Sequence, residues 1–372
     1  MKIGVPRESA EGENRVALVP ESVKSLLKKE GVEIVVESGA GEVAGHPDAQ
    51  YEEAGAKVGS HADVLASDLI LHVAPLSVGE IGELRRGQYL ISHLSPLTSA
   101  DTNQALASAG VSALAMELIP RTTRAQAMDA LSSQATAAGY AATLIAARES
   151  GRFWGMLTTA AGTIRPVRVL VLGAGVAGLQ AVATAKRLGA IVTGFDIRRA
   201  AWEQIASLGG RPLELDFIPD AEDEGGYARP LTDEENQQVR DAIDENAAKQ
   251  DVIITTAAIP GRPAPTLITA AGVANMGPGS VILDLAAETG GNCELTEPGQ
   301  TVVKGGVKIV GPRNLASELP GHASQLYAKN LENLLGLMIT EEGNPTLNFE
   351  DDIIDAATVT HEGEIRGERT AR

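Results

Sequence analysis

Three glycines follow an apolar run in the middle of the chain, within the segment Arg168-Val-Leu-Val-Leu-Gly-Ala-Gly-Val-Ala-Gly178. Gly173 permits a tight turn after a strand, Gly175 lets the backbone approach a pyrophosphate, and Gly178 lets the next helix pack closely on that strand. Because a helical run follows, the phosphates would meet the free N–H groups and the positive dipole end of a helix. The segment therefore predicts a dinucleotide-binding loop.

An acidic residue ends the next predicted strand. Ala190 to Phe195 is largely apolar and is followed by Asp196, close to the position about 20 residues past the glycines where such sites bind the adenosine ribose. A carboxylate accepts hydrogen bonds from both ribose hydroxyls and repels a 2′-phosphate. This residue favours NAD(H) over NADP(H).

A second polar segment runs from Arg121 to Gln134. Its apolar residues recur at helical spacing, which predicts a buried stripe. Its polar residues lie on a different face or just before it, and they are Arg121, Arg124, Gln126, Asp129, Ser132 and Ser133. Amide, carboxylate, hydroxyl and guanidinium groups together suit a nicotinamide carboxamide and its ribose. A solvated helix face with an Arg–Asp pair explains the same composition, so both interpretations stay open.

Other candidate residues carry weaker signals. The acidic stretch from Leu213 to Gln238 contains Gly225-Gly-Tyr227, which predicts a mobile loop whose tyrosine covers a bound adenine, or a plain flexible insertion. His93 and Arg15 are candidates for an oxidoreductase site, although a structural role suits His93 better. No His/Cys cluster has the spacing of metal ligands, so we predict no metal.

Alternating strands and helices must position these groups. We expect strands at Lys2–Val5, Val32–Glu37, Asp68–Val73, Gln88–Ser92 and Val111–Ala115, then at Arg168–Leu172, Ile191–Phe195, Asp251–Thr255, Ser280–Asp284 and Lys308–Val310. Helices are expected at about Pro20–Glu30, Asp48–Ala54, Ser77–Arg85, Ser99–Ala109, Arg124–Glu149 and His322–Ile339. This order predicts an α/β protein with two Rossmann-like, doubly wound parallel-sheet domains separated by a cleft.

The last helix is expected to return to the first domain. The predicted domains are therefore residues 1–130 plus 321–372, which form a discontinuous α/β domain, and residues 131–320, which bind the dinucleotide. Residues after Asn344 are polar and acidic apart from Asp351–Val359, and they are expected to form an extension or arm.

Composition excludes several classes of function. The 372 residues carry a formal net charge of −18, which argues against nucleic acid and against unaided docking on an anionic membrane. A single cysteine, Cys293, fits a reducing cytoplasm. The longest apolar run, Ala135 to Ala147, is shorter than the about 20 residues of a spanning helix, so no direct membrane insertion is expected.

Several motifs together resemble one family. They include Pro6-Arg-Glu, Glu13-Asn-Arg-Val-Ala, Ala115-Met-Glu-Leu, the Arg121 to Gln134 segment, the glycine motif, Gly225-Gly-Tyr-Ala, Ile259-Pro-Gly-Arg-Pro-Ala-Pro and Gly290-Gly-Asn-Cys. Over nearly its whole length the chain resembles the NAD(H)-binding components of proton-translocating NAD(P) transhydrogenases, in the alanine dehydrogenase/transhydrogenase family. This resemblance implies NAD(H) as cofactor and direct hydride transfer to NADP+ on a partner chain.

The resemblance also implies roles for individual residues. The nicotinamide end of NAD(H) would contact Arg121, Thr122, Thr123 and Arg124. The carboxamide and its ribose would contact Asp129 and Ser132, and Gln126 would reach toward the NADP(H) ribose of the partner. The pyrophosphate would lie against Ala174, Gly175 and Val176, between Gly173 and Gly178. The adenosine ribose would be surrounded by Asp196, Ile197 and Arg198, and the adenine side would be closed by Gly226, Tyr227 and Ala258. The loop from Asp220 to Glu224 is more acidic than is usual in the family.

The resemblance further implies a homodimer with NADP(H)-binding and transmembrane partner subunits, peripheral on the cytoplasmic face of the membrane. The main alternative is an NAD-dependent alanine dehydrogenase. In those enzymes a lysine that binds the substrate occupies the position of Ala74 in this chain. His93 does match their histidine, and Glu288 stands where they have an aspartate. A third possibility is a redox-sensing module that binds NAD(H) without transferring hydride.

Overall fold

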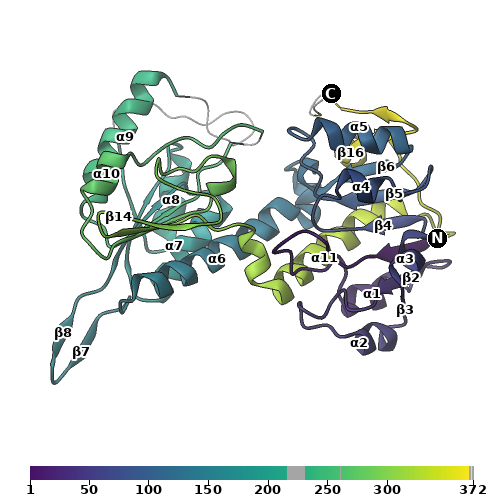
Figure 1. The fold of residues 1–372 in the computed structure, drawn as a ribbon, viewed down its shortest axis with the longest axis horizontal. Coiled ribbons are helices and arrows are strands. Elements are labelled where there is room, and N and C mark those ends of the chain that lie inside the picture. Colours follow the sequence, from purple (N-terminus) through teal and green to yellow (C-terminus); the bar gives the residue numbers. More distant parts are fainter. Residues whose placement is uncertain (216–230, 260, 368–369, 371–372) are drawn as a thin grey trace. The chain divides into compact units, whose positions relative to one another are not determined.

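The computed structural model describes residues 1–215, 231–259, 261–367 and 370. The chain divides into two compact units, of which unit 1 contains Met1–Gln134 and Ala316–Arg372 and unit 2 contains Ala135–Leu315. Unit 1 therefore takes in both ends of the chain. The long helix α6 (Ala130–Ser150) passes through the point in the sequence where the units divide (Figure 1).

Unit 1 is built on a sheet whose described strands follow the order β3-β2-β1-β4-β5-β6-β16-β17. The strands are β1 (Lys2–Val5), β2 (Glu33–Glu37), β3 (Lys57–Gly59), β4 (Leu69–Leu71), β5 (Tyr89–Ser92), β6 (Ser112–Ala115), β16 (Thr358–His361) and β17 (Glu364–Ile365). Strands β1 to β6 pair in parallel, and β16 and β17 are antiparallel. The order of the first six is that of a doubly wound sheet, with a topological switch point between β1 and β4.

The α-helices of unit 1 are short, apart from one of 19 residues near the end of the chain. They are α1 (Pro20–Leu26), α2 (Asp48–Glu53), α3 (His61–Leu65), α4 (Val78–Ile81), α5 (Ala100–Ala109), α11 (Pro320–Met338) and α12 (Asp352–Ala357). The 3-10 helices are η1 (Met116–Leu118), η2 (Thr123–Met128) and η4 (Leu315–Glu318), which begins at the last residue of unit 2.

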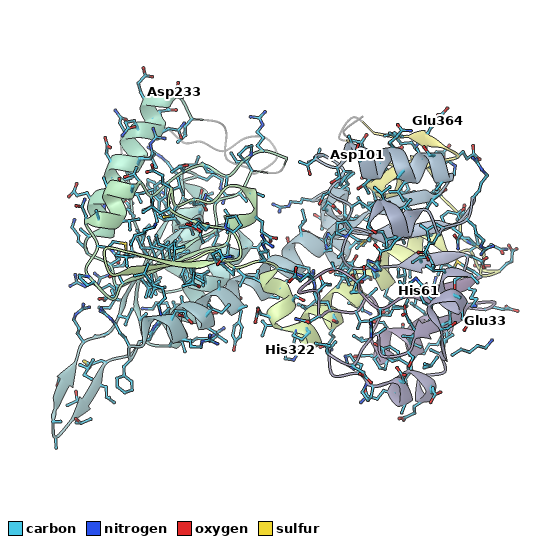
Figure 2. All side chains as sticks on the ribbon, in the orientation of Figure 1. Glu33, His61, Asp101, Asp233, His322 and Glu364 are labelled. Atoms are coloured by element: carbon cyan, nitrogen blue, oxygen red, sulfur yellow. The ribbon has the colours of Figure 1, made fainter. Side chains whose placement is uncertain are left out.

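Alternation along the strands of unit 1 builds two cores, one on each face of the sheet. Leu69 and Leu71 of β4 pack into one core with α1 and α11, whereas Ile70 between them packs into the other with α4 and α5. Successive side chains of a strand point to opposite faces, so a strand covered on both faces is apolar throughout. Charged side chains such as Glu33, Asp101 and Glu364 project from the exposed surface (Figure 2).

Unit 2 repeats this architecture. Its described sheet has the order β11-β10-β9-β12-β13-β15-β14, with only β14 antiparallel. The strands are β9 (Arg168–Leu172), β10 (Ile191–Phe195), β11 (Arg211–Pro212), β12 (Val252–Thr255), β13 (Val281–Asp284), β14 (Thr301–Lys304) and β15 (Val307–Val310). The helices are α7 (Val176–Arg187), α8 (Ala200–Ser207), α9 (Asp233–Ala247), α10 (Ala270–Ala274) and the 3-10 helix η3 (Ala287–Thr289). The predicted doubly wound α/β fold is confirmed.

A separate two-stranded hairpin extends from unit 2 (Figure 1). Its strands are β7 (Leu157–Thr159) and β8 (Gly162–Ile164), which pair with each other and with no other described strand. The sequence did not indicate this hairpin, because its strands are too short to show a period of their own.

Four predicted elements were wrong. The helix expected at Ser77–Arg85 ends at Ile81. The expected extension after Asn344 belongs to unit 1, since α12 leads into β16, which pairs with β6 and buries Val359 completely. The helix expected at Pro20–Glu30 ends at Leu26, and the chain reaches Gly31 through a turn. The helix expected at Arg124–Glu149 begins only at Ala130, because Asp129 leaves the helical region at ψ 87° and the residues before it form η2.

Within the described ranges, no helix combines the length and apolar character needed to cross a bilayer.

Candidate functional site

The glycine loop of unit 2 connects β9 to α7. Gly173 has a φ of +91°, a conformation that side chains strongly disfavour, and it turns the chain after β9. A Cβ atom added at Gly178 would lie 1.8 Å from the carbonyl oxygen of Gly173. Both glycines are therefore required by the folded backbone itself, because the first turn of α7 packs directly on the loop.

Gly175 is different, because nothing in the described chain requires it to be glycine. Its φ of −75° and ψ of −167° are ordinary extended values, and an added Cβ would meet no atom within 4 Å. It stands at the N-cap of α7, where no side chain accepts a hydrogen bond from the first turn. Open space at the N-terminus of a helix of this length suits the pyrophosphate of a dinucleotide.

Asp196 follows β10 and lies beside the same loop. Its carboxylate accepts hydrogen bonds from the Ala174 amide, at 2.8 Å, and from the Arg198 amide and guanidinium, at 2.9 Å each. The residue is buried, with an exposed fraction of 7 %. The Asp196 carboxylate thus joins the glycine loop to the end of β10. Ribose hydroxyls bound there would donate to the same carboxylate that accepts from Arg198.

Three neighbouring strands of unit 2 bring their following loops to one edge of the sheet. The loop after β9 holds Ala174 and leads to Val176, the first residue of α7. The loop after β10 holds Ile197 and Arg198, and the loop after β12 holds Ala258. Ala258 is exposed, and the residue before it exchanges hydrogen bonds with the Asn292 side chain at 3.1 and 2.8 Å. Gly226 and Tyr227 lie outside the described residues.

In unit 1, Asp129 caps α6. Its Oδ1 accepts a hydrogen bond from the Ser132 amide at 2.9 Å, and its Oδ2 accepts one from the Ser132 hydroxyl at 2.6 Å. An aspartate that binds the amide three residues later is a strong N-cap. The structure therefore brings Asp129 and Ser132 together, through the break in the helix that the sequence pattern did not indicate.

The remaining polar residues of this segment lie on or just before η2. Arg121, Thr122, Thr123 and Gln126 are exposed. Arg124 lies in an ion pair with Asp351, at 2.7 and 2.8 Å, and also contacts Asp352. The acidic partners come from the C-terminal segment, so no local sequence signal indicated them.

A cluster of buried polar residues lies where the chain leaves β1 and β4 in unit 1. The carboxylate of Glu8 accepts hydrogen bonds from the amides of Val73 and Ala74, at 2.7 and 3.0 Å, and lies 3.1 Å from His72 Nδ1. Burial raises the pKa of the Glu8 carboxyl, against the opposing effects of the His72 charge and the two amides. The sequence did not indicate Glu8, because a loop residue carries no periodic signal.

His93 and Arg15 are both engaged within unit 1. His93 Nδ1 lies 3.5 Å from Glu117 Oε2, and its ring lies 5.3 Å from that of Tyr327. Burial opposes ionisation of Glu117, but the hydrogen bond and charge of His93 lower the pKa of its carboxyl below the usual value. Arg15 is bound by the Glu13 carboxylate at 2.6 and 2.8 Å and by Gln134 at 2.8 Å.

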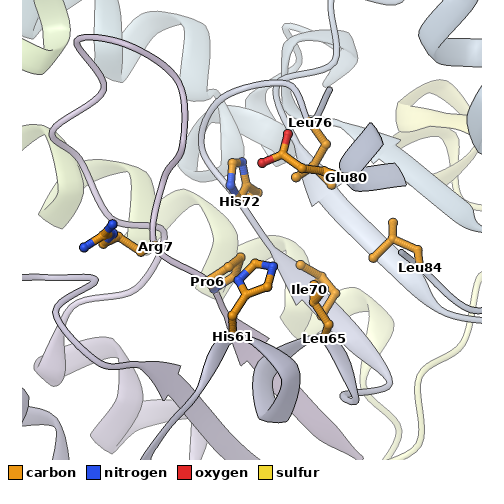
Figure 3. A pocket seen from close by; sticks show the side chains of 9 residues that line it. All are labelled: Pro6, Arg7, His61, Leu65, Ile70, His72, Leu76, Glu80 and Leu84. Carbon is orange, nitrogen blue, oxygen red and sulfur yellow. The ribbon is translucent and has the colours of Figure 1, made fainter. Parts of the chain in front are cut away.

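A small pocket lies at the switch point of the unit 1 sheet (Figure 3). Pro6 and Arg7, which directly follow β1, and His72, which follows β4, are among its lining residues. Glu80 on its wall accepts hydrogen bonds from Ser9 and Ser77. Within the described part of the chain, none of the predicted site residues lines the pocket.

Glu288 is exposed and accepts a hydrogen bond from the Asn314 amide at 3.3 Å. Asp284, in the preceding strand, is fully buried and accepts hydrogen bonds from Thr255 and Thr296 at 2.8 and 2.7 Å. The Asp284 carboxylate thus supports the loop after β13 instead of facing a ligand.

Comparisons with known proteins agree with this architecture. Residues 4–138 match the family model of the alanine dehydrogenase/PNT N-terminal domain, and residues 142–368 match that of the C-terminal domain. An NAD(P) transhydrogenase subunit alpha protein of Rhodospirillum rubrum is 46% identical over 375 residues, which cover 98% of this chain and 97% of that protein.

A solved transhydrogenase structure and an alanine dehydrogenase are also similar to this chain. The crystal structure of transhydrogenase from Sinorhizobium meliloti superposes with a TM-score of 0.89 at 45% identity, covering 98% of this chain and 100% of that one. The alanine dehydrogenase of Mycobacterium tuberculosis is 32% identical over 306 residues, covering 80% of this chain and 76% of that protein. Together the matched domains, the two doubly wound sheets and the glycine loop show that this chain belongs to the alanine dehydrogenase/PNT family.

Proposed function

We propose that this chain is the NAD(H)-binding subunit of a proton-translocating transhydrogenase, and that hydride passes directly between its NADH and NADP+ bound on a partner chain. The observation that carries the proposal is the open backbone at Gly175, set between the N-terminus of α7 and the Asp196 carboxylate. The similarity to transhydrogenase alpha subunits over 98% of the chain supports it.

The chain's own residues would bind and orient the nucleotide. The amides of Ala174, Gly175 and Val176 would donate to the pyrophosphate, and Asp196 would accept from the adenosine ribose. Asp129 and Ser132 would exchange part of their mutual hydrogen bond for the carboxamide and its ribose, beside Arg121. When bound, the nicotinamide ring supplies or accepts the hydride. Gln126, exposed on η2, would reach toward the NADP(H) ribose.

Direct transfer fits the chemistry of these side chains better than amino-acid oxidation does. Transfer between two nicotinamide rings requires apposed rings and excluded water, and no acid or base. Oxidation of an amino acid requires groups that move protons at the amine. In alanine dehydrogenases a lysine binds the substrate, and this chain has Ala74 at that position.

We further propose that the chain works on the cytoplasmic face of a membrane, bound to NADP(H)-binding and transmembrane subunits, as a homodimer. The hairpin of β7 and β8 supports the dimer. An isolated two-stranded hairpin is marginally stable in water, and Met156 and Ile164 on it are 70% and 46% exposed. A second copy of the chain would cover these apolar side chains.

Replacing Met156 and Ile164 together with glutamate is expected to convert the dimer into a monomer, because each charge would be desolvated in an apolar contact. The measurement is the molar mass from light scattering across a concentration series, with Val303→Glu as a control at an exposed apolar residue on β14. The thermal unfolding midpoint of the monomer should stay close to that of the control. A double variant that keeps the dimer mass would place the interface elsewhere.

The proposed reaction is tested by mixing the purified chain with an NADP(H)-binding transhydrogenase partner. Reduction of an NAD analogue by NADPH is followed, and the chain alone with L-alanine and NAD+ is the control. Transfer in the mixture and none in the control is the expected result. Turnover of L-alanine by the chain alone would establish the dehydrogenase instead. NADH binding without transfer in either assay would favour a sensing module.

Gln126→Ala is expected to slow hydride transfer in that mixture by about tenfold, the contribution of one positioning contact, while NADH affinity changes little. Gln126 is exposed and η2 is held by other residues, so folding should be unaffected. The affinity is measured by fluorescence titration of NADH and the rate by stopped flow. An unchanged rate would remove Gln126 from the proposed mechanism.

A further inference from the structure

The segment that carries Gln126 and leads to Asp129 depends on tertiary contacts for its position. Thr123–Met128 is a 3-10 helix, whose hydrogen bonds have poorer geometry than those of an α-helix. Two of its side chains, Ala125 and Met128, are buried in the core of unit 1, whereas Gln126 is exposed. The two buried side chains hold only one face of η2, so its exposed face must be fixed by other groups.

Arg124 supplies such a contact. Its Nη1 donates to Asp351 Oδ2 at 2.7 Å and its Nη2 donates to Asp351 Oδ1 at 2.8 Å, and the same nitrogen contacts Asp352. A guanidinium that faces one carboxylate with two parallel hydrogen bonds has a defined orientation as well as a defined distance. Hydrogen bonding to Arg124 lowers the pKa of Asp351 to about 2. We refer to these three residues as the Arg124 anchor.

The acidic side of this anchor is itself fixed. Asp351 is the N-cap of α12, and its Oδ1 accepts hydrogen bonds from the amides of Ile353 and Ile354 at 2.9 and 3.4 Å. Both isoleucine side chains are completely buried. Helix α12 then continues into β16, which pairs with β6 in the unit 1 sheet. Movement of Asp351 would therefore require α12 to leave the core.

A neutral contact holds the other end of η2. Asn330 on α11 donates from Nδ2 to the Ala127 carbonyl at 2.9 Å, and its Oδ1 accepts from the Ser133 hydroxyl at 2.7 Å. Asn330 and the Arg124 anchor thus join η2 to two separate helices from the C-terminal region of unit 1. Asn333 on α11 also donates to the Ala127 carbonyl, at 3.3 Å. Among these polar contacts of η2, only the anchor depends on charge.

We propose that Asp351 and Asp352 are positioning residues for hydride transfer, which hold η2 through Arg124 so that Gln126 and Asp129 keep their places. In this assignment Arg124 is an anchor of the segment and not a direct contact to the nicotinamide. The inference rests on the proposed function for its effect on rate. Its structural part, the fixing of η2 by two carboxylates, stands independently.

The test compares Asp351→Asn/Asp352→Asn with Arg124→Gln and with the triple variant. Asparagine is also a good N-cap, so the first variant removes the charges while α12 keeps its cap. Glu350→Gln is the matched control, because it removes a negative charge from the exposed neighbouring residue. Three quantities are measured: amide hydrogen exchange of residues 123–128, NADH affinity, and the hydride-transfer rate with the NADP(H)-binding partner at saturating nucleotide.

The anchor predicts the same result for both partners of the ion pair. In Asp351→Asn/Asp352→Asn and in Arg124→Gln, exchange of residues 123–128 should become faster and the transfer rate should fall about fivefold, as expected for a partly exposed pair that orients a reacting segment. NADH affinity should change less than twofold. The triple variant should be no slower than either parent, since both remove one interaction. Arg124→Lys, which keeps the positive charge, should transfer hydride faster than Arg124→Gln, which a purely structural defect would not predict.

Two results would overturn the proposal. One is wild-type exchange and transfer in Asp351→Asn/Asp352→Asn. The other is Arg124→Gln weakening NADH binding by about tenfold or more while the aspartate variant binds normally, which would make Arg124 a nucleotide contact. If the wild-type chain transfers no hydride with the partner, the proposed function fails, and the exchange measurement alone then decides whether the carboxylates hold η2.

Discussion

NADH binding to the Gly175→Val variant is expected to weaken by about a hundredfold, which is about 2.7 kcal/mol of binding free energy, while the folded chain keeps its stability. The physical reason is the open space at this position. An added Cβ meets no protein atom within 4 Å, so the side chain would occupy only the volume proposed for the pyrophosphate. Affinity is measured by fluorescence titration, and stability by thermal unfolding.

Gly178→Val is the matched control, because the two glycines lie in one motif and differ in what surrounds them. A Cβ at Gly178 would lie 1.8 Å from the Gly173 carbonyl oxygen and 2.9 Å from Thr256 Oγ1. Forcing α7 away from the loop should cost about 3 kcal/mol, or roughly 6–12 °C in the unfolding midpoint for a unit of this size. Equal losses of stability in both variants, or normal NADH binding by Gly175→Val, would contradict the proposed phosphate site.

The Asp196→Asn variant is expected to bind NADH about tenfold more weakly and NADPH about tenfold more tightly, since one charged hydrogen bond is worth about that much. In the wild-type chain the carboxylate engages the Arg198 guanidinium at 2.9 Å. Asparagine keeps an acceptor for the Ala174 amide but has no charge. The freed guanidinium can then bind a 2′-phosphate, which guanidinium groups bind well. Both affinities are measured by isothermal titration calorimetry.

Arg198→Gln in the Asp196→Asn background tests the origin of that change. It should abolish the gain in NADPH affinity and leave the weakened NADH affinity unaltered. If Asp196→Asn instead loses affinity for both nucleotides in equal measure, the carboxylate serves mainly to hold the glycine loop through Ala174. The two outcomes separate nucleotide selection from support of the loop.

The doubly wound architecture and the glycine turn after β9 were predictable from short-range patterns. Gly173 is required by its positive φ, and Gly178 is required by its close approach to the Gly173 carbonyl. Both requirements arise within the motif, so the spacing of the glycines in the sequence was enough to predict the turn. Asp196 was predictable because β9 and β10 pair in parallel and their following residues meet at one edge. The family could also be predicted from the sequence, because its motifs extend over nearly the whole chain.

Other features lacked any local signal. The break at Asp129 was missed because both η2 and α6 have helical composition, and only the capping bonds to Ser132 distinguish one helix from two. The hairpin of β7 and β8 was missed because three-residue strands are too short to show alternation. The C-terminal segment was misjudged as an arm because its less polar run, Asp351–Val359, is too short to indicate by itself that it leads into a strand of the sheet.

Residue types and their spacing were enough to specify the order of the main strands and helices and the glycine turn between β9 and α7. Each of these follows from the steric and hydrogen-bonding needs of residues near one another in the chain. Folding in three dimensions was needed to pair Arg124 with Asp351, which is 227 residues away, and Glu8 with His72. Such pairs form only because the folded sheets bring particular strand ends and helix termini close together. Residue type alone does not predict which of these ends become neighbours.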